Sequence, residues 1–202
     1  MILKQFDQNK KAIINPEDIV EAIDGFPEIV VSCFERSTFS RMVERYKGIK
    51  IGSLSIANLE VLIYKIEYKG LNMAIFNSYV GSPGCVGLLE ELHVMGMRKL
   101  ILFGTCGILN HDIDDVSIII PDRAVRDEGT SYHYVSASNE IDVNINTLNA
   151  FEEFLTKEKI SYTKGKVWTT DAMYRETKDK MNRRRDNSCR YGVLSGCSIG
   201  KI

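Results

Sequence analysis

The stretch Lys99-Leu100-Ile101-Leu102-Phe103 is almost wholly apolar, and Gly104-Thr105-Cys106-Gly107 follows it directly. A short apolar run of this kind is typical of a strand that is buried on both faces of a mostly parallel sheet. The small and polar residues after it then lie at the carboxyl end of the strand, where open α/β sheets bind their ligands. This stretch therefore predicts an α/β fold with a ligand site at one edge of a sheet.

Strands and helices are predicted to alternate on both sides of this stretch. Two β-favouring runs, residues 61–68 and 71–78, are separated by Lys69-Gly70, which predicts a hairpin. The other expected strands are residues 28–33 and 116–120, and the expected helices are residues 16–23, 38–46 (capped by Ser37), 85–95 (ending at Gly96) and 147–157. Residues 121–139 are expected to form a polar loop. This alternation predicts one three-layer α/β/α domain.

The composition narrows the class of protein. The 202 residues are 44% hydrophobic and 26% charged, which suits a soluble globular domain. Because 26 basic side chains face 27 acidic ones, no global field attracts nucleic acid or an anionic membrane. The apolar runs are shorter than the roughly 20 residues that cross a bilayer. The cysteine count is odd, and no pair has C-x-x-C spacing. We therefore expect a cytoplasmic protein without a disulfide framework, whose partner is a small molecule or another protein.

The turn Gly81-Ser82-Pro83-Gly84 is a candidate anion site. Ser82 is expected to cap the helix that follows, with Pro83 at its first position. Backbone N–H groups at a helix start attract a phosphate or a carboxylate. The alternative is that these glycines only turn the chain.

Residues 123–134 are dense in groups that can donate, accept and stack, which is a functional indication in a loop. Within this segment, His133 is a candidate general base, a partner of a ribose hydroxyl, or merely a satisfied polar residue. The alternative for the whole segment is a solvated loop with internal ion pairs. His93 and His111 have no partner at ligand spacing, so we expect no metal site.

The segment Trp168-Thr169-Thr170-Asp171-Ala172-Met173 is expected to follow a strand and to open a helix. Its hydroxyls and Asp171 are good helix caps, and Trp168 with Met173 would wall an apolar slot for a flat ring. The alternative is a capped helix over a core tryptophan. Cys106 lacks a visible base, so it is interpreted as a small buried residue.

The order of these motifs resembles the nucleoside phosphorylase superfamily (the purine nucleoside and uridine phosphorylase family), most strongly its uridine phosphorylase-like members. The resemblance runs from about residue 29 to residue 185, through Gly81-Ser82-Pro83, Glu90-Glu91-Leu92, Gly104-Thr105-Cys106-Gly107, residues 121–134 and residues 168–177. It implies an α/β/α fold around a central mixed, partly barrel-like sheet. It also implies phosphate-dependent cleavage of a nucleoside to free base and ribose 1-phosphate in nucleoside salvage.

The resemblance further implies a set of ligand contacts. Carried over by position, the phosphate contacts are Gly81, Thr105, Arg36 and Arg126, and the nucleoside contacts are Thr169, Thr170, Met173 and His133. No cofactor is implied, since inorganic phosphate is a co-substrate. Family members form dimers that build hexamers with shared active sites, so a homo-oligomer is expected.

Three departures weaken the implied phosphate site. The family's Gly-Asp-Pro-x-Arg motif reads Ser32-Cys33-Phe34-Glu35-Arg36 here, which keeps only the arginine. Leu102 stands where an arginine often precedes the Gly-Thr motif, and a further family arginine aligns near Asn58-Leu59. If phosphate is poorly held, water becomes the nucleophile. A hydrolytic nucleosidase is therefore the alternative enzyme.

The last residues depart from the family altogether. The expected Met-Glu motif, whose glutamate binds the ribose hydroxyls, is absent, so no catalytic residue is assigned. Residues 186–202 show no helical or strand period, and codons for residues 191–196 read one nucleotide later can encode Met-Glu-Cys-Ser-Ala. We interpret residues 1–185 as an incomplete phosphorylase-like domain without its last strand and helix, and residues 186–202 as a frameshifted tail. The alternatives are a solvated basic tail, an RNA-binding arm, or an inactive subunit that only binds ligand.

Overall fold

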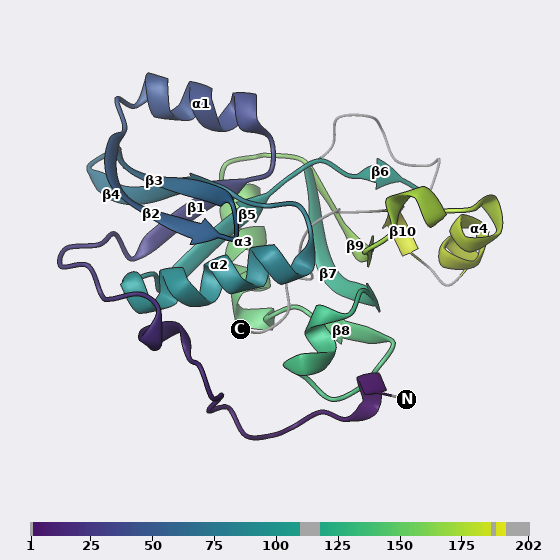
Figure 1. The fold of residues 1–202 in the computed structure, drawn as a ribbon. Coiled ribbons are helices and arrows are strands. Elements are labelled where there is room, and N and C mark those ends of the chain that lie inside the picture. The colour runs from purple at the N-terminus through teal and green to yellow at the C-terminus, as the bar shows by residue number, and fades with distance from the viewer. Residues whose placement is uncertain (1, 110–117, 187–188, 193–202) are drawn as a thin grey trace. The chain divides into compact units, whose positions relative to one another are not determined.

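The structure, a computed structural model, describes residues 2–109, 118–186 and 189–192. The chain divides into two compact units, a first unit of residues 8–104 and a second unit of residues 1–7 with 105–202. Each unit contains one five-stranded mixed sheet with helices packed against it (Figure 1). The α/β class is therefore confirmed. The described strands do not close into a barrel, unlike the partly barrel-like sheet that the resemblance implied.

The first unit is built around three parallel strands. Its strand order is β2-β3-β4-β1-β5, and β1 pairs in parallel with both β4 and β5. The carboxyl ends of these three strands consequently meet at one edge of the sheet. The bounds are β1 (Ile29–Cys33), β2 (Ile49–Ile56), β3 (Leu59–Tyr68), β4 (Leu71–Asn77) and β5 (Lys99–Phe103).

The predicted hairpin is confirmed as β3 and β4, which pair antiparallel up to Tyr68 and Leu71. The turn residues Lys69 and Gly70 have φ angles of 50° and 79°. Two successive positive φ angles give the backbone twist that a two-residue hairpin turn needs. The expected burial of β5 on both faces is wrong, because Ile101 is 47% exposed on this edge strand.

Two helices, α1 (Arg36–Arg45) and α2 (Ser82–Met95), lie on opposite sides of the first sheet (Figure 1). Gly96 ends α2 with a φ of 136°, as predicted. The helix expected over residues 16–23 is only the short 3₁₀ turn η2 (Pro16–Asp18). Cys33 and Cys106 are free thiols.

The second unit has the strand order β6-β10-β9-β7-β8. Its strands are β6 (Gly107–Ile108), β7 (Ile118–Asp127), β8 (Glu140–Asp142), β9 (Tyr162–Thr170) and β10 (Cys189–Gly192). The expected polar loop of residues 121–139 is wrong at its start, because β7 continues to Asp127. Parallel pairing with β9 along this length satisfies the backbone of β7 despite its polar side chains.

The C-terminal residues also differ from the expectation. The strand β10 pairs in parallel with β9 and antiparallel with β6, although no strand was predicted after residue 186. Backbone pairing creates this strand without any alternation of apolar residues. Residues 187–188 and 193–202, which carry most of the frameshift interpretation, lie outside the described residues.

The helices of the second unit are α3 (Ile145–Lys157) and α4 (Lys178–Asp186), with 3₁₀ turns η1 (Ile2–Lys4), η3 (Thr130–His133) and η4 (Met173–Arg175). Asn144 caps α3 by accepting from the N–H groups of Asn146 and Thr147. The predicted helix start near Trp168 is wrong, because residues 168–170 finish β9 and the helix begins only at Lys178. None of the described helices combines the length and the apolar character that a membrane crossing requires.

Candidate functional site

The candidate anion site begins at the C-terminal edge of the first sheet, which we define as the residues directly after β1, β4 and β5. Cys33 is in register with Asn77 and with Phe103, so the three strands end side by side. The carbonyl oxygen of Cys33 accepts hydrogen bonds from the Ser78 N–H (2.9 Å) and from the Asn77 amide (2.8 Å). These bonds fix the ends of β1 and β4 together, as a ligand site at this edge requires.

After β1, Arg36 is the first residue of α1 and its side chain is exposed. The predicted cap Ser37 is wrong, because the carboxylate of Glu35 caps α1 by accepting from the N–H groups of Thr38 (2.5 Å) and Ser37 (2.8 Å). Hydrogen bonds from Thr38 and Ser37 lower the pKa of Glu35 to about 2. The helix start therefore already holds a carboxylate, and the cationic group at this end of α1 is the Arg36 guanidinium.

After β4, the start of α2 is open. Gly81 is the residue before the helix, with a φ of 111°, and among the described residues no side-chain cap bond is made at this end. A Cβ at Gly81 would meet no atom within 4 Å, so there is room beside the backbone. The predicted cap Ser82 is wrong, because Ser82 is the first helical residue and is buried. The first turn of the 14-residue helix α2 contains no acidic residue, so its N–H groups are suited to an anion.

In the second unit, the ends of β7 and β9 carry three of the predicted contacts, Arg126, Thr169 and Thr170. Arg126 is in register with Thr169, and Asp127 with Thr170. Because strand side chains alternate, Thr169 shares a face with Arg126, whereas Thr170 shares the opposite face with Asp127. A ligand that touches both threonine hydroxyls must therefore lie beyond the strand end. Both threonines are buried, whereas Thr105, His133 and Met173 are exposed.

Arg126 differs from Arg36, because the residue is only 4% exposed and its guanidinium bonds within its own segment. Nε donates to the Ser131 Oγ (2.8 Å), and Nη1 to the Ser138 Oγ (2.8 Å) and to the carbonyl of Ser136 (2.7 Å). Nη2 donates to the carbonyl of Val135 (3.2 Å). The guanidinium also stacks over the ring of Tyr132, 4.0 Å from its centroid. This arginine holds the loop of residues 128–138 with four of its five N–H donors.

A second polar cluster attaches α4 to the sheet. The indole of Trp168 donates to Asp127 Oδ2 (2.8 Å), which also pairs with Lys180 (2.7 Å) and Arg184 (3.4 Å). Burial alone would raise the pKa of Asp127, but hydrogen bonds from Lys180 and Trp168 outweigh it and hold the pKa below its usual value. Both cations also lie near the Trp168 ring.

This cluster decides between the two interpretations of the tryptophan. Trp168 is fully buried beneath α4, whereas Met173 is 54% exposed. The core position favours a tryptophan that supports a helix over one that walls a slot for a flat ring. Sequence reasoning missed the role of Asp127. The available signal was the i, i+4 spacing of Lys180 and Arg184, which places two cations on one helix face.

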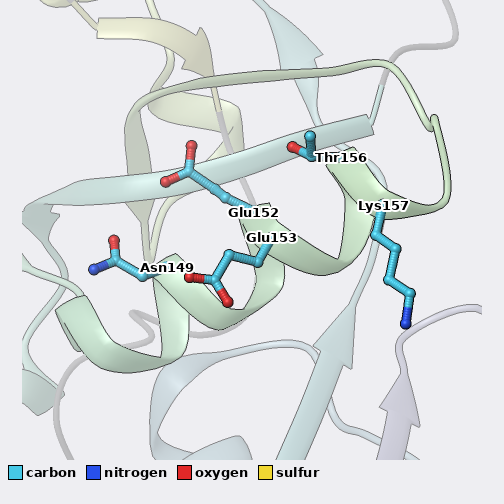
Figure 2. Close-up of a pocket in the computed structure, with 5 residues that line it drawn as sticks. All are labelled: Asn149, Glu152, Glu153, Thr156 and Lys157. Carbon is cyan, nitrogen blue, oxygen red and sulfur yellow. The ribbon is translucent and has the colours of Figure 1, made fainter.

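A groove of about 580 Å³ runs along α3 and is lined by none of the predicted contacts (Figure 2). Its lining residues are Asn149, Glu152, Glu153, Thr156 and Lys157. They all project from one polar helix face, and Glu152 is already paired with Lys164 (3.0 Å) and Tyr162 (3.1 Å). We interpret this groove as a solvated helix surface.

The fold is shared with nucleoside phosphorylases of known structure. Uridine phosphorylase from Vibrio fischeri ES114 superposes with a TM-score of 0.72 at 23% identity, covering 92% of this chain and 77% of that chain. Purine nucleoside phosphorylase from Toxoplasma gondii superposes with a TM-score of 0.70 at 17% identity, covering 84% and 68%. An α/β protein of the nucleoside phosphorylase fold is therefore the class that the structure defines.

The family model of the phosphorylase superfamily matches residues 29–190, and the chain belongs to this superfamily. Guanosine phosphorylase of Halorubrum lacusprofundi is 29% identical over 124 residues, which are 59% of this chain and 50% of that protein. Uridine phosphorylase of Thermococcus kodakarensis is 29% identical over 108 residues, which are 54% and 39%. The chain thus spans about half the length, or less, of these curated relatives.

Proposed function

We propose that this protein is a nucleoside phosphorylase of the uridine phosphorylase-like kind. It uses inorganic phosphate to cleave the N-glycosidic bond of a nucleoside, which yields the free base and ribose 1-phosphate. The observation that carries the proposal is the C-terminal edge of the first sheet, where an exposed Arg36 and the uncapped start of α2 are both suited to an anion. Membership of the phosphorylase superfamily supports the same reaction.

The proposed roles follow the chemistry of the bond that breaks. Phosphate attacks C1′ of the ribose while the base leaves, so positive charge develops on the sugar and negative charge on the base. We assign phosphate to Arg36, Gly81, Thr105 and Arg126. We assign the nucleoside to the ends of β7 and β9, through Thr169, Thr170, Met173 and His133. Pyrimidine nucleosides are the favoured substrates.

The proposal includes a cellular setting. We propose that the enzyme acts in nucleoside salvage in the cytoplasm as a homo-oligomer, with the nucleoside and phosphate as its small-molecule partners. It needs no organic cofactor or metal, because phosphate itself is the nucleophile. Nucleic acid and membranes are not proposed partners, since the chain carries balanced charge.

A hydrolytic nucleosidase is the second candidate, and the state of Arg126 is the observation that favours it. Four of its five N–H donors bond to acceptors in residues 131–138, so little of this inferred phosphate contact remains for a ligand. With phosphate held less firmly, water becomes the competing nucleophile at C1′.

The deciding experiment is base release from uridine, inosine and guanosine at a series of phosphate concentrations, with the sugar product identified by ³¹P NMR. We expect release to rise with phosphate and saturate, with one ribose 1-phosphate formed for each base. Equal release without phosphate, accompanied by free ribose, would establish the nucleosidase. Nucleoside binding without any release would establish an inactive ligand-binding subunit.

A further inference from the structure

Two segments that contribute to the proposed nucleoside site touch through one carboxylate. The first segment ends β9 and continues through Asp171 to Met173. The second is the loop of residues 128–138, which contains His133. Asp171 Oδ2 accepts a hydrogen bond of 3.0 Å from the N–H of Gly129, at the beginning of that loop. This bond joins residues 42 positions apart in the sequence.

The start of the loop is held by its own hydrogen bonds, so the bond that attaches it to β9 affects the position of the whole segment. The buried carboxylate of Glu128 accepts from the Ser131 N–H (2.9 Å) and from the Ser131 hydroxyl. The same hydroxyl oxygen accepts from Arg126 Nε (2.8 Å). Residues 128–131 are therefore held as one body from which η3 extends to His133. A shift of Gly129 relative to β9 would move His133 relative to Thr169.

We propose that Asp171 is a positioning residue of the nucleoside site, which sets the distance between the His133 turn and the β9 end. The inference rests on the proposed function, because it assigns a role within that same site. Asp171 acts through Gly129 and needs no contact with substrate. Small displacements of groups that orient a substrate weaken its binding and its alignment.

The proposed role of Asp171 depends on its oxygen as a hydrogen-bond acceptor and not on its negative charge. A backbone N–H requires only an oxygen acceptor, which an asparagine side chain also supplies. Asp171→Asn should therefore keep the link, whereas Asp171→Ala removes it. Asp171 is exposed, so neither change leaves a buried group without a partner. Asp179→Ala on α4 is the matched control, because Asp179 is an exposed aspartate of the same unit that the proposed site does not use.

The kinetic test measures the KM for nucleoside and the KM for phosphate separately. We expect Asp171→Ala to raise the nucleoside KM about fivefold to tenfold, the size of one hydrogen bond. Its phosphate KM should stay unchanged, and Asp171→Asn and Asp179→Ala should resemble the unmodified protein in both constants. Equal damage by Asp171→Ala and Asp171→Asn would overturn the proposal. So would a parallel rise of both KM values, which would indicate general damage to the fold.

An activity-independent measurement keeps the two proposals distinguishable. Hydrogen exchange of the amides in residues 128–134, followed without substrate, reports directly on the link between Gly129 and Asp171. We expect faster exchange in Asp171→Ala and near-normal exchange in Asp171→Asn. Unchanged exchange in Asp171→Ala would overturn the positioning role. If the unmodified protein shows no turnover, the proposed reaction fails, while the exchange result still decides whether Asp171 holds the loop.

Discussion

The loop of residues 128–138 and the turn before α2 use their polar groups in opposite ways. The loop contains many side chains that can bind a ligand, but Arg126, Glu128 and Ser131 are bonded to one another. The turn has few such side chains, yet its backbone N–H groups have no side-chain cap. A dense set of polar residues therefore indicates a loop held by its own hydrogen bonds as readily as a binding site, because neighbouring groups can bond to one another.

The two arginines assigned to phosphate differ in the same way. Arg126 is buried and holds four acceptors of its own segment, whereas Arg36 is exposed at the start of α1. We therefore expect the first to contribute mainly to stability and the second mainly to anion binding.

The largest effect is expected from Arg126→Ala. The change leaves the half-buried hydrogen bonds to the carbonyl oxygens of Val135 and Ser136 without their donor, and it releases the loop. We expect a loss of about 3 kcal/mol in the free energy of unfolding. Urea unfolding, followed by the emission of Trp168, measures it, since this is the single tryptophan. An unchanged urea midpoint would contradict the structural role of Arg126.

Asp127→Asn is expected to have the second largest effect. The amide can still accept from the Trp168 indole, but the ion pairs with Lys180 and Arg184 are lost. We expect a loss of about 1–2 kcal/mol, with a shift in Trp168 emission as α4 loosens. Glu153→Gln on the exposed face of α3 is a charge-matched control that should leave both readings unchanged.

The contribution of Asp127 to the free energy of unfolding is expected to depend on pH. The pKa of Asp127 is lower in the folded protein than its ordinary value of 3.8, so its contribution is complete above that value. The contribution is lost as the pH falls through the folded pKa. The difference in urea midpoint between the unmodified protein and Asp127→Asn should thus be constant near neutrality and shrink below about pH 4. A difference that grows on acidification would contradict the ion pairs.

Gly81→Ala is expected to have a smaller effect. The φ of 111° at Gly81 is unfavourable for a residue with a Cβ, although no atom would clash with it. We expect a loss of about 1 kcal/mol in the free energy of unfolding. Gly87 lies inside α2, and a Cβ there would also meet no atom within 4 Å, so Gly87→Ala should instead raise the free energy of unfolding. Changes of the same sign in both variants would show that the backbone at Gly81 is not the cause.

Arg36→Ala should have the smallest effect on stability and yet alter function. We expect a change within about 0.5 kcal/mol, because the side chain is exposed. The KM for phosphate should rise about tenfold, as for the loss of one charged contact. Arg41→Ala on the same helix is the control for net charge. If Arg41→Ala raises the phosphate KM as strongly, the effect is a general field and not a contact at Arg36.

Local signals explain how far the sequence predicted the fold. The hairpin around Lys69-Gly70, the strand β1 and the helix α3 all follow from short-range patterns, and the structure confirms them. The length of β7 could not be predicted, because Arg126 looks like a loop residue until its acceptors at residues 131–138 are known. The strand β10 likewise depends on pairing with β9, which leaves no trace in its own residues.

The candidate site shows the same limit. Gly81 and Arg36 stand at the predicted edge of a sheet, because that edge follows from strands and their connections. The predicted helix caps Ser37 and Ser82 are wrong, since the Glu35 side chain accepts from the first turn of α1 and Ser82 is buried. Which of several nearby oxygens caps a helix is decided by side-chain geometry, and composition carries little of that information.

The hairpin turn at Lys69 and Gly70 has a consequence for the order of folding. Adjacent strands joined by two residues close with little loss of chain entropy, in about 1–10 μs. The neighbouring parallel contact between Cys33 and Asn77 joins residues 44 positions apart, so its closure is slower. The edge that presents Arg36 and Gly81 therefore assembles late, when β1 docks onto a preformed hairpin. In a nascent chain, the proposed anion site would form only after this long-range step.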